Sequence, residues 1–161
     1  MNSKDKAKRA AGVRGKTILV VDDDTAVREM IGRVLAAEDY EVLTAANGTE
    51  ALGVAASHRL DLVILDLNMP VKGGWDTFAE LTTKDPLLAV IIITAKPNQF
   101  FTSLGAGVGA LLEKPLDFPT LLKTVTALLK ESDDLRLARI TGTTWACATV
   151  PPHGTKPENK L

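Results

Sequence analysis

The sequence predicts an α/β fold, in which a parallel β-sheet is covered by helices on both faces. Short apolar segments alternate five times with amphipathic segments that have helical spacing, the order typical of repeated strand–helix units. Most of these apolar segments are hydrophobic at nearly every position, as expected for strands buried on both sides. The chain has 161 residues, of which 45% are hydrophobic, so it is long enough for one such domain with flanking tails.

The first half of the pattern contains three strands and two helices. A β-branched run predicts the first strand at Thr17–Val21, and apolar residues at helical spacing predict a helix over Thr25–Glu38. Asn47-Gly48 separates a short strand from an Ala-rich helix. The three remaining elements are expected at Glu41–Ala45, Thr49–His58 and Leu62–Leu65.

The second half begins with a loop, predicted from Met69-Pro70 and Gly73-Gly74. Trp75 and Phe78 then begin a helix and are expected to pack on the sheet. The last helix has the clearest apolar face in the chain, and Asp117 is a plausible N-cap for it. The elements of this half are a strand at Ala89–Thr94, a weak helix at Pro97–Gly105, a strand at Ala110–Glu113, and the last helix with Phe118, Leu121, Leu122, Val125, Leu128 and Leu129 on its face.

Composition excludes several classes of protein. A single cysteine, Cys147, excludes a disulfide framework and a cysteine-based zinc site. No apolar run approaches the roughly 18 residues that a membrane span requires. The apolar stretch after the basic start runs directly into Asp22-Asp23-Asp24, so it does not resemble the core of a signal peptide. We therefore expect no membrane insertion and a cytoplasmic location.

Charge divides the chain into three parts. Residues 1–16 contain six Lys or Arg and one Asp, whereas residues 17–131 contain nine Lys or Arg and sixteen Asp or Glu. The acidic middle argues against direct nucleic-acid binding. We expect a basic flexible tail over residues 1–15, a folded domain over 16–131, and a mostly disordered tail over 132–161, with a possible short helix near Leu135, Leu137 and Ile140.

Polar side chains follow the ends of four predicted strands. The first strand is followed by Asp22, Asp23 and Asp24, the third by Asp66, and the fifth by Lys114, while Thr94 ends the fourth. A parallel sheet brings these carboxyl ends to one edge. Clustered carboxylates suit Mg²⁺, and a cation, a lysine and a hydroxyl together can hold a phosphoryl group. A carboxylate among them can serve as the nucleophile.

Four separated motifs resemble the receiver domain of two-component response regulators. They are Ile18-Leu19-Val20-Val21-Asp22-Asp23-Asp24, Asp66-Leu67-Asn68-Met69-Pro70 with Gly74, Thr94-Ala95, and Lys114-Pro115. The resemblance covers roughly residues 16–131. It implies a flavodoxin-like, doubly wound fold with a five-stranded parallel sheet in the order 2-1-3-4-5 and five helices. It also implies a regulator that accepts a phosphoryl group from a histidine kinase or phosphotransfer protein. The 30 residues after position 131 are too few for a DNA-binding output domain, so we expect a single-domain regulator whose output is protein–protein contact.

The resemblance assigns roles position by position. Asp66 is similar to the phosphoryl acceptor, and Thr94 and Lys114 to the residues that contact the phosphoryl group. Asp22, Asp23, Asp66 and the backbone carbonyl of Asn68 are similar to the Mg²⁺-binding set, and Lys114-Pro115 resembles a cis peptide of the family. Such proteins catalyse only their own phosphorylation and dephosphorylation, so the chain is not expected to be an enzyme acting on other substrates.

Each of these residues also has a simpler interpretation. Asp24 or Thr25 can cap the following helix, Asp66 can be a solvated loop acid, and Lys114 an ordinary surface lysine. Capping accounts for one aspartate of the three, and the context of the four motifs favours the functional interpretation of the others.

Departures from the family pattern concern the output surface. Leu111 stands where the family often has Tyr or Phe, so the usual coupling of the threonine to a rotating aromatic is absent. We expect a downstream protein to bind the face made by the fourth helix, fifth strand and fifth helix, including Phe100, Phe101 and Leu111.

Two alternative functions remain. A pseudo-receiver would work as an interaction module without phosphorylation, which the missing aromatic favours and the intact Asp66, Thr94 and Lys114 oppose. A haloacid dehalogenase-type phosphatase would use Asp22 and Asp24 as its two acids. Its following threonine falls at Ala26, however, and it does not explain the motif at Asp66.

Overall fold

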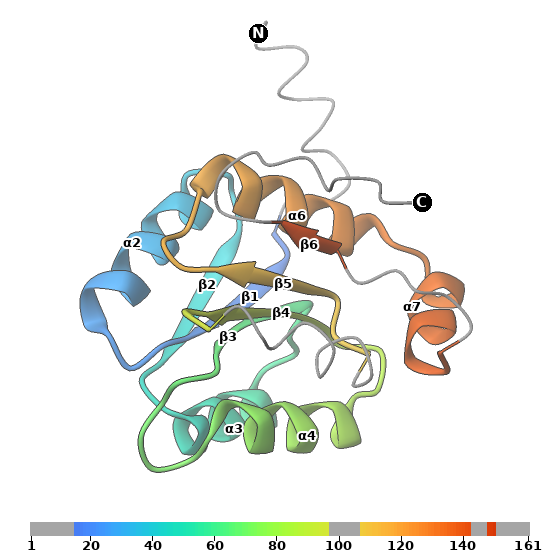
Figure 1. Cartoon of the computed structure of the whole chain (residues 1–161), viewed down its shortest axis with the longest axis horizontal. Coiled ribbons are helices and arrows are strands. Elements are labelled where there is room, and N and C mark those ends of the chain that lie inside the picture. Colours follow the sequence, from blue (N-terminus) through green and yellow to red (C-terminus); the bar gives the residue numbers. More distant parts are fainter. Residues whose placement is uncertain (1–14, 97–106, 143–147, 151–161) are drawn as a thin grey trace, which may run out of the picture.

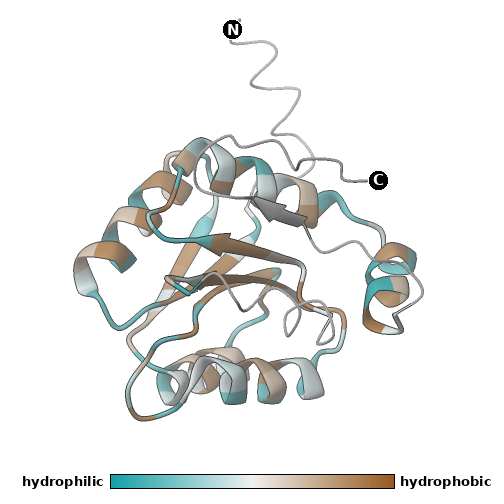
Figure 2. Cartoon of the chain, viewed as in Figure 1, coloured by the Kyte–Doolittle hydropathy of each residue, from teal (hydrophilic) through white to brown (hydrophobic). Residues whose placement is uncertain are grey.

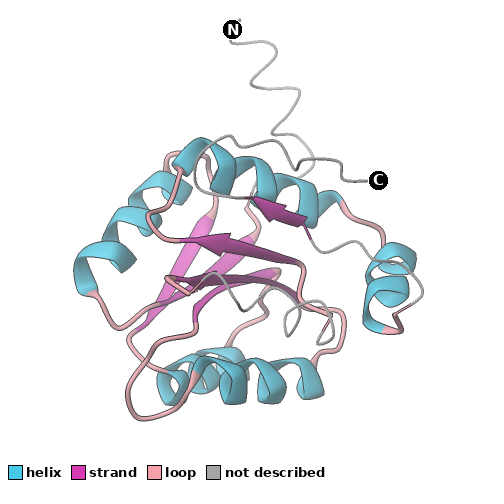
Figure 3. Ribbon diagram, in the orientation of Figure 1, coloured by secondary structure: helices cyan, strands magenta, loops and turns pink. Residues whose placement is uncertain are grey.

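The computed structural model describes residues 15–96, 107–142 and 148–150. Within these residues, a parallel sheet in the order β2-β1-β3-β4-β5-β6 lies between two layers of helices (Figure 1; Figure 3). The strands are β1 (Thr17–Val21), β2 (Glu41–Ala45), β3 (Leu62–Asp66), β4 (Ala89–Thr94), β5 (Ala110–Glu113) and β6 (Ala148–Val150). The helices are α2 (Thr25–Ala36), α3 (Gly48–Ser57), α4 (Gly74–Lys84), α6 (Phe118–Lys130) and α7 (Asp133–Ile140).

The predicted parallel sheet in the order 2-1-3-4-5 is confirmed, and the strands begin and end within one residue of the predicted positions. The predicted helix over Pro97–Gly105 lies outside the described residues. The first helix ends at Ala36, two residues before the predicted end. Asp39 lies just beyond, at a φ of 65°, and this left-handed residue turns the chain toward β2.

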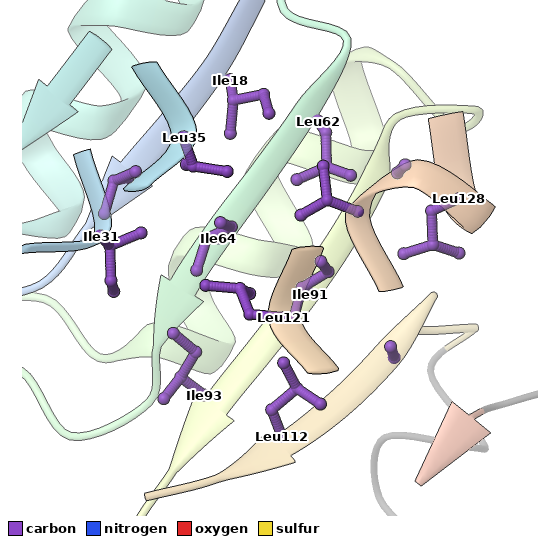
Figure 4. Packing of buried hydrophobic residues seen from close by; sticks show 14 of the residues in the cluster. Ile18, Ile31, Leu35, Leu62, Ile64, Ile91, Ile93, Leu112, Leu121 and Leu128 are labelled. Carbon is purple, nitrogen blue, oxygen red and sulfur yellow. The ribbon is translucent and has the colours of Figure 1, made fainter. Parts of the chain in front are cut away.

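Two hydrophobic clusters fill the layers above and below the sheet. Side chains of β1, β3 and β4 point alternately to the two faces, so consecutive residues such as Ile18 and Leu19 belong to different clusters. One cluster packs against α2 and α6, through residues such as Ile31 and Leu121 (Figure 4), and the other against α3 and α4. Burial on both faces explains why these strands are hydrophobic throughout, which Figure 2 shows for the sheet interior.

Residues after the last predicted helix differ from the prediction. A mostly disordered tail was expected over 132–161, but α7 and the short strand β6 lie within it, and β6 extends the sheet beyond β5. The possible short helix near Leu135 is confirmed as α7, which Ser132 caps through a hydrogen bond from the Leu135 N–H. Contacts distant in sequence hold this helix, and local hydrophobic periodicity does not reveal them.

Candidate functional site

The carboxyl ends of β1, β3, β4 and β5 meet at one edge of the sheet. The chain leaves β1 toward β2 on one side and returns to β3 on the other, so the strand order reverses between β1 and β3, the position at which open parallel sheets bind ligands. Asp22, Asp66 and Lys114 lie at this edge, as the sequence predicts, and salt bridges join them.

Asp22 directly follows β1 at this edge of the sheet and is only 1% exposed. One carboxylate oxygen accepts the backbone N–H of Asp24 at 2.9 Å, and the other accepts the Lys114 ammonium at 3.1 Å. Its own N–H donates to the Ala45 carbonyl of the neighbouring strand end. These hydrogen bonds hold Asp22 in one position and keep its carboxylate beside the Lys114 ammonium.

Asp66 ends β3 and is 2% exposed. Its Oδ1 accepts the Asn68 N–H at 3.1 Å, and its Oδ2 lies 3.4 Å from the Lys114 Nζ. Burial raises the pKa of the Asp66 carboxyl, and the nearby Asp22 charge raises it further, while the Asn68 bond and Lys114 partly oppose this. The carboxylate form of Asp66 is therefore less favourable here than in water, and an added cation would relieve it.

Lys114 follows β5 and bridges the two buried carboxylates. Its backbone N–H donates to the Thr94 carbonyl at 2.9 Å, which places the residue beside the end of β4. Burial lowers the pKa of the Lys114 ammonium, but the hydrogen bond to Asp22 and the charge of Asp66 outweigh burial, so the net pKa is raised. The ammonium is thus a fixed positive charge, and the predicted cis peptide between Lys114 and Pro115 is present.

Asp23 completes a cluster of three carboxylates. Oxygen atoms of Asp22, Asp23 and Asp66 all lie within 4.8 Å of one another, and Asp23 is exposed while the other two are buried. The set suits Mg²⁺, which takes one or a few carboxylates and keeps several waters on its open side. Asn68, whose backbone carbonyl was predicted as a further ligand, lies in the loop two residues after Asp66 and is exposed.

Thr94 and Asp24 occupy different places around the cluster. Thr94 is fully buried at the end of β4, and its Oγ1 accepts the Lys96 N–H at 3.0 Å. Asp24 is the N-cap of α2, since its Oδ1 accepts the N–H groups of Ala26 and Val27. The capping interpretation is therefore correct for Asp24. The carboxylate cluster that could hold a metal ion consists of Asp22, Asp23 and Asp66.

Two further residues shape the site. Arg28, one helical turn after the cap, donates from Nη1 to the Asp22 carbonyl at 2.6 Å, an interaction that its sequence position does not reveal. Gly74 begins α4 in contact with the backbone at the end of β3, and a Cβ there would lie 2.6 Å from both the Asp66 carbonyl oxygen and the Leu67 Cα. Glycine is required at this position because the helix and this backbone approach so closely.

The family model of the response regulator receiver domain matches residues 18–126. The chain belongs to this family. Receiver domains are signalling proteins of two-component systems rather than metabolic enzymes, they bind Mg²⁺ at an acidic pocket, and they interact with histidine kinases or phosphotransfer proteins. The resemblance identified from the four motifs is therefore confirmed.

Curated relatives include the response regulator MprA of Mycobacterium avium, which is 35% identical over 137 residues, 84% of this chain and 60% of the relative. The corresponding protein of Mycobacterium bovis is 38% identical over 117 residues, 71% of this chain and 51% of the relative. The chain thus spans only half to three fifths of the length of these relatives.

Solved structures support the same family. The chemotaxis protein CheY4 of Vibrio cholerae has a TM-score of 0.67 and 32% identity, covering 71% of this chain and 98% of that one. The response regulator TrrA of Thermotoga maritima, solved with Mg²⁺ and BeF, has a TM-score of 0.66 and 35% identity, covering 70% of this chain and 98% of that one.

The structure describes only part of the face that was expected to bind a downstream protein. Leu111 is 2% exposed and belongs to the cluster under α3 and α4, so its side chain is not presented to a partner as predicted. The sheet alternation places it inward, and β6 borders its backbone. Phe100 and Phe101 lie outside the described residues. Among the helices of the described segments, none is long and apolar enough to span a membrane.

Proposed function

We propose that this receiver accepts a phosphoryl group on Asp66 in a Mg²⁺-dependent reaction and thereby switches protein–protein contacts. The observation that carries the proposal is the pair of buried carboxylates, Asp22 and Asp66, joined by Lys114 Nζ at 3.1 and 3.4 Å beside the exposed Asp23. A structural ion pair with Lys114 gives no reason for a third carboxylate beside it, whereas a divalent cation would neutralise the combined charge of the three.

The Asp66 carboxylate is the nucleophile in this proposal. An oxygen of Asp66 attacks the phosphorus of a phosphohistidine in line, an oxygen–phosphorus bond forms as the phosphorus–nitrogen bond breaks, and the histidine nitrogen keeps the electron pair. The Asn68 N–H bond to Oδ1 orients the carboxylate. The donor is a histidine kinase or a phosphotransfer protein.

Asp22, Asp23, Asp66 and the Asn68 carbonyl are the groups that would hold Mg²⁺. When bound, Mg²⁺ would supply charge neutralisation for the carboxylates and the incoming phosphoryl oxygens. The three oxygens within 4.8 Å fit this role, and the Thermotoga maritima relative was solved with Mg²⁺ and BeF.

Lys114 and Thr94 hold the transferred group. The Lys114 ammonium already contacts Asp66 Oδ2 and is positioned to neutralise a phosphoryl oxygen attached there. Thr94 accepts the Lys96 N–H through Oγ1, which leaves its hydroxyl hydrogen available to donate to a phosphoryl oxygen. Position 111 is an aliphatic leucine. A conformational change at Thr94 must therefore be transmitted to the protein surface without a rotating aromatic side chain at position 111.

Phosphorylation by a small donor tests the proposal. The protein is incubated with Mg²⁺ and acetyl phosphate, and its intact mass is measured beside Asp66→Asn and a matched control, Asp24→Asn. Asparagine caps a helix as well as aspartate does, so the control retains α2 and the three-carboxylate cluster. Wild type and the control should gain about 80 Da, the mass of one phosphoryl group, and Asp66→Asn should not.

A pseudo-receiver is the second candidate, favoured by Leu111 in place of an aromatic residue. It predicts no added mass with acetyl phosphate or with a phosphohistidine donor, although the protein is folded and binds Mg²⁺. A gain of mass by Asp66→Asn would contradict the assignment of the acceptor.

A further inference from the structure

The outer edge of β5 is covered by the chain's own later residues. β6 pairs in parallel with β5 in the register Ala110↔Ala148, Leu111↔Thr149 and Leu112↔Val150. Without β6, β5 would be an edge strand with unpaired backbone groups, the kind of edge to which an extended segment of another chain can add. This edge matters to the site, because Lys114 follows β5 directly.

Helix α7 is anchored to the domain by a half-buried arginine, Arg136, and a buried one, Arg139. Arg136 donates to the Leu87 carbonyl at 3.2 Å and to the Leu128 carbonyl at 2.9 Å, and so joins the loop before β4 to the end of α6. The Arg139 side chain, 4% exposed, pairs with Glu131. Burying a guanidinium is unfavourable unless it is paired and hydrogen-bonded, so these contacts specify one position for α7.

The same helix ends where a strand parallel to β5 must begin. Ile140, the last residue of α7, packs against Gly107, where a Cβ would lie 3.2 Å from the Ile140 Cα. Gly107 precedes β5 by three residues, so α7 delivers the chain to the amino end of β5. The eight residues from Ile140 to Ala148 can extend over roughly 25 Å, which is ample for the same molecule to supply β6.

We propose that α7 and β6 form an intramolecular cover that closes the edge of β5 to extended segments of other chains, including a second copy of this one. The occupant is Ala148–Val150 of the same molecule, and α7 holds it at high local concentration. Three residue pairs make a short contact, so an extended partner segment that pairs with β5 must displace β6 first.

Hydrogen exchange in the full chain tests the cover without any phosphoryl donor, so its failure is distinguishable from failure of the proposed function. Exchange is measured for Ala110–Glu113 in wild type, Thr149→Pro and Val150→Pro. Successive N–H groups of a strand face opposite edges, so one of the two prolines removes the N–H that faces β5. That variant should exchange β5 amides roughly tenfold faster, the effect of losing one hydrogen bond.

The anchor is tested with Arg136→Gln, which should also accelerate exchange in β5. The matched control is Arg33→Gln, because Arg33 is exposed on α2 and makes only a weak ion pair with Glu29. Exchange in β2, the opposite edge of the sheet, should be unchanged in all variants, which shows that the domain remains folded.

Three results would overturn the proposal. The first is that neither proline variant accelerates exchange in β5. The second is that Arg136→Gln changes exchange in β5 no more than Arg33→Gln does. The third is that light scattering shows wild type to be a dimer whose β5 protection falls on dilution. The last result would assign the cover to a second copy instead of the same molecule.

Discussion

Removal of the Asp66 charge should stabilise the protein when no divalent cation is present. Asp66 lies within 4.8 Å of both Asp22 and Asp23, and 3.4 Å from the Lys114 ammonium. With an effective dielectric constant of about 20, the repulsion from Asp22 at that limit costs about 3.5 kcal/mol and the lysine contact returns about 5 kcal/mol, whereas solvent screens the charge of the exposed Asp23. The attraction exceeds the Asp22 repulsion by only about 1.5 kcal/mol, and desolvation of the buried carboxylate, the largest cause of its raised pKa, outweighs this difference.

Asp66→Asn keeps the shape of the side chain and an oxygen that accepts the Asn68 N–H. We expect its free energy of unfolding at pH 7 to exceed that of wild type by about 1–3 kcal/mol, and its melting temperature to be higher by about 3–8 °C. The assay is thermal and urea unfolding in EDTA, repeated with Mg²⁺. Mg²⁺ should stabilise wild type more than the variant, because it binds the folded acidic cluster.

The stability difference between Asp66→Asn and wild type should depend on pH in a direction set by the pKa of Asp66. The pKa of Asp66 is raised in the folded state by burial and by Asp22. A raised carboxyl pKa contributes stability below the unfolded pKa of 3.8, and that contribution is lost as pH rises through the folded value. The advantage of Asp66→Asn should therefore be absent at low pH and increase toward pH 7. A variant less stable than wild type at pH 7 in EDTA would refute the reasoning, because Lys114 would then outweigh burial and repulsion.

Four further substitutions, of which Gly53→Ala is a control, test the packing and charge around the site. Gly74→Ala should destabilise the fold by about 2 kcal/mol or more, because the new Cβ meets the backbone of Asp66 and Leu67. Gly53 in α3 has open space around it, so Gly53→Ala should be neutral or stabilising by up to about 1 kcal/mol. Lys114→Gln should lower stability at pH 7 by about 3 kcal/mol, since the buried carboxylates of Asp22 and Asp66 lose their half-buried cation, and should slow labelling by acetyl phosphate. Val71→Gly should raise stability by about 1 kcal/mol, because Val71 has a φ of 74° and its exposed side chain contributes little burial.

Urea unfolding measures the free energy of unfolding of all four variants. The following results would contradict the predictions. Equal stability of Gly74→Ala and Gly53→Ala would mean that the backbone of Asp66 and Leu67 moves without cost. Unchanged stability of Lys114→Gln in EDTA would mean that the carboxylates are compensated by other groups. Lower stability of Val71→Gly would mean that the valine side chain makes contacts that outweigh its backbone strain.

Much of the fold was predictable because local sequence reports burial directly. A strand covered on both faces must be apolar throughout, as Ala89–Thr94 is, and α6 shows its buried stripe at helical spacing. The chemistry was predictable for a related reason. Asp66 and Lys114 stand where buried strands end, and in a parallel sheet all such ends lie at one edge.

The sequence by itself therefore determined the alternation of strands and helices and the residue types at the acidic edge. Only the tertiary structure decided which carboxylates converge, because Asp22, Asp23 and Asp24 are adjacent in the chain, and Asp24 turns away to cap α2. Likewise, the covered edge of β5 depends on Arg136, whose partners lie 8 and 49 residues away. Such contacts leave no local periodicity, since their energy arises between segments that only the folded chain brings together.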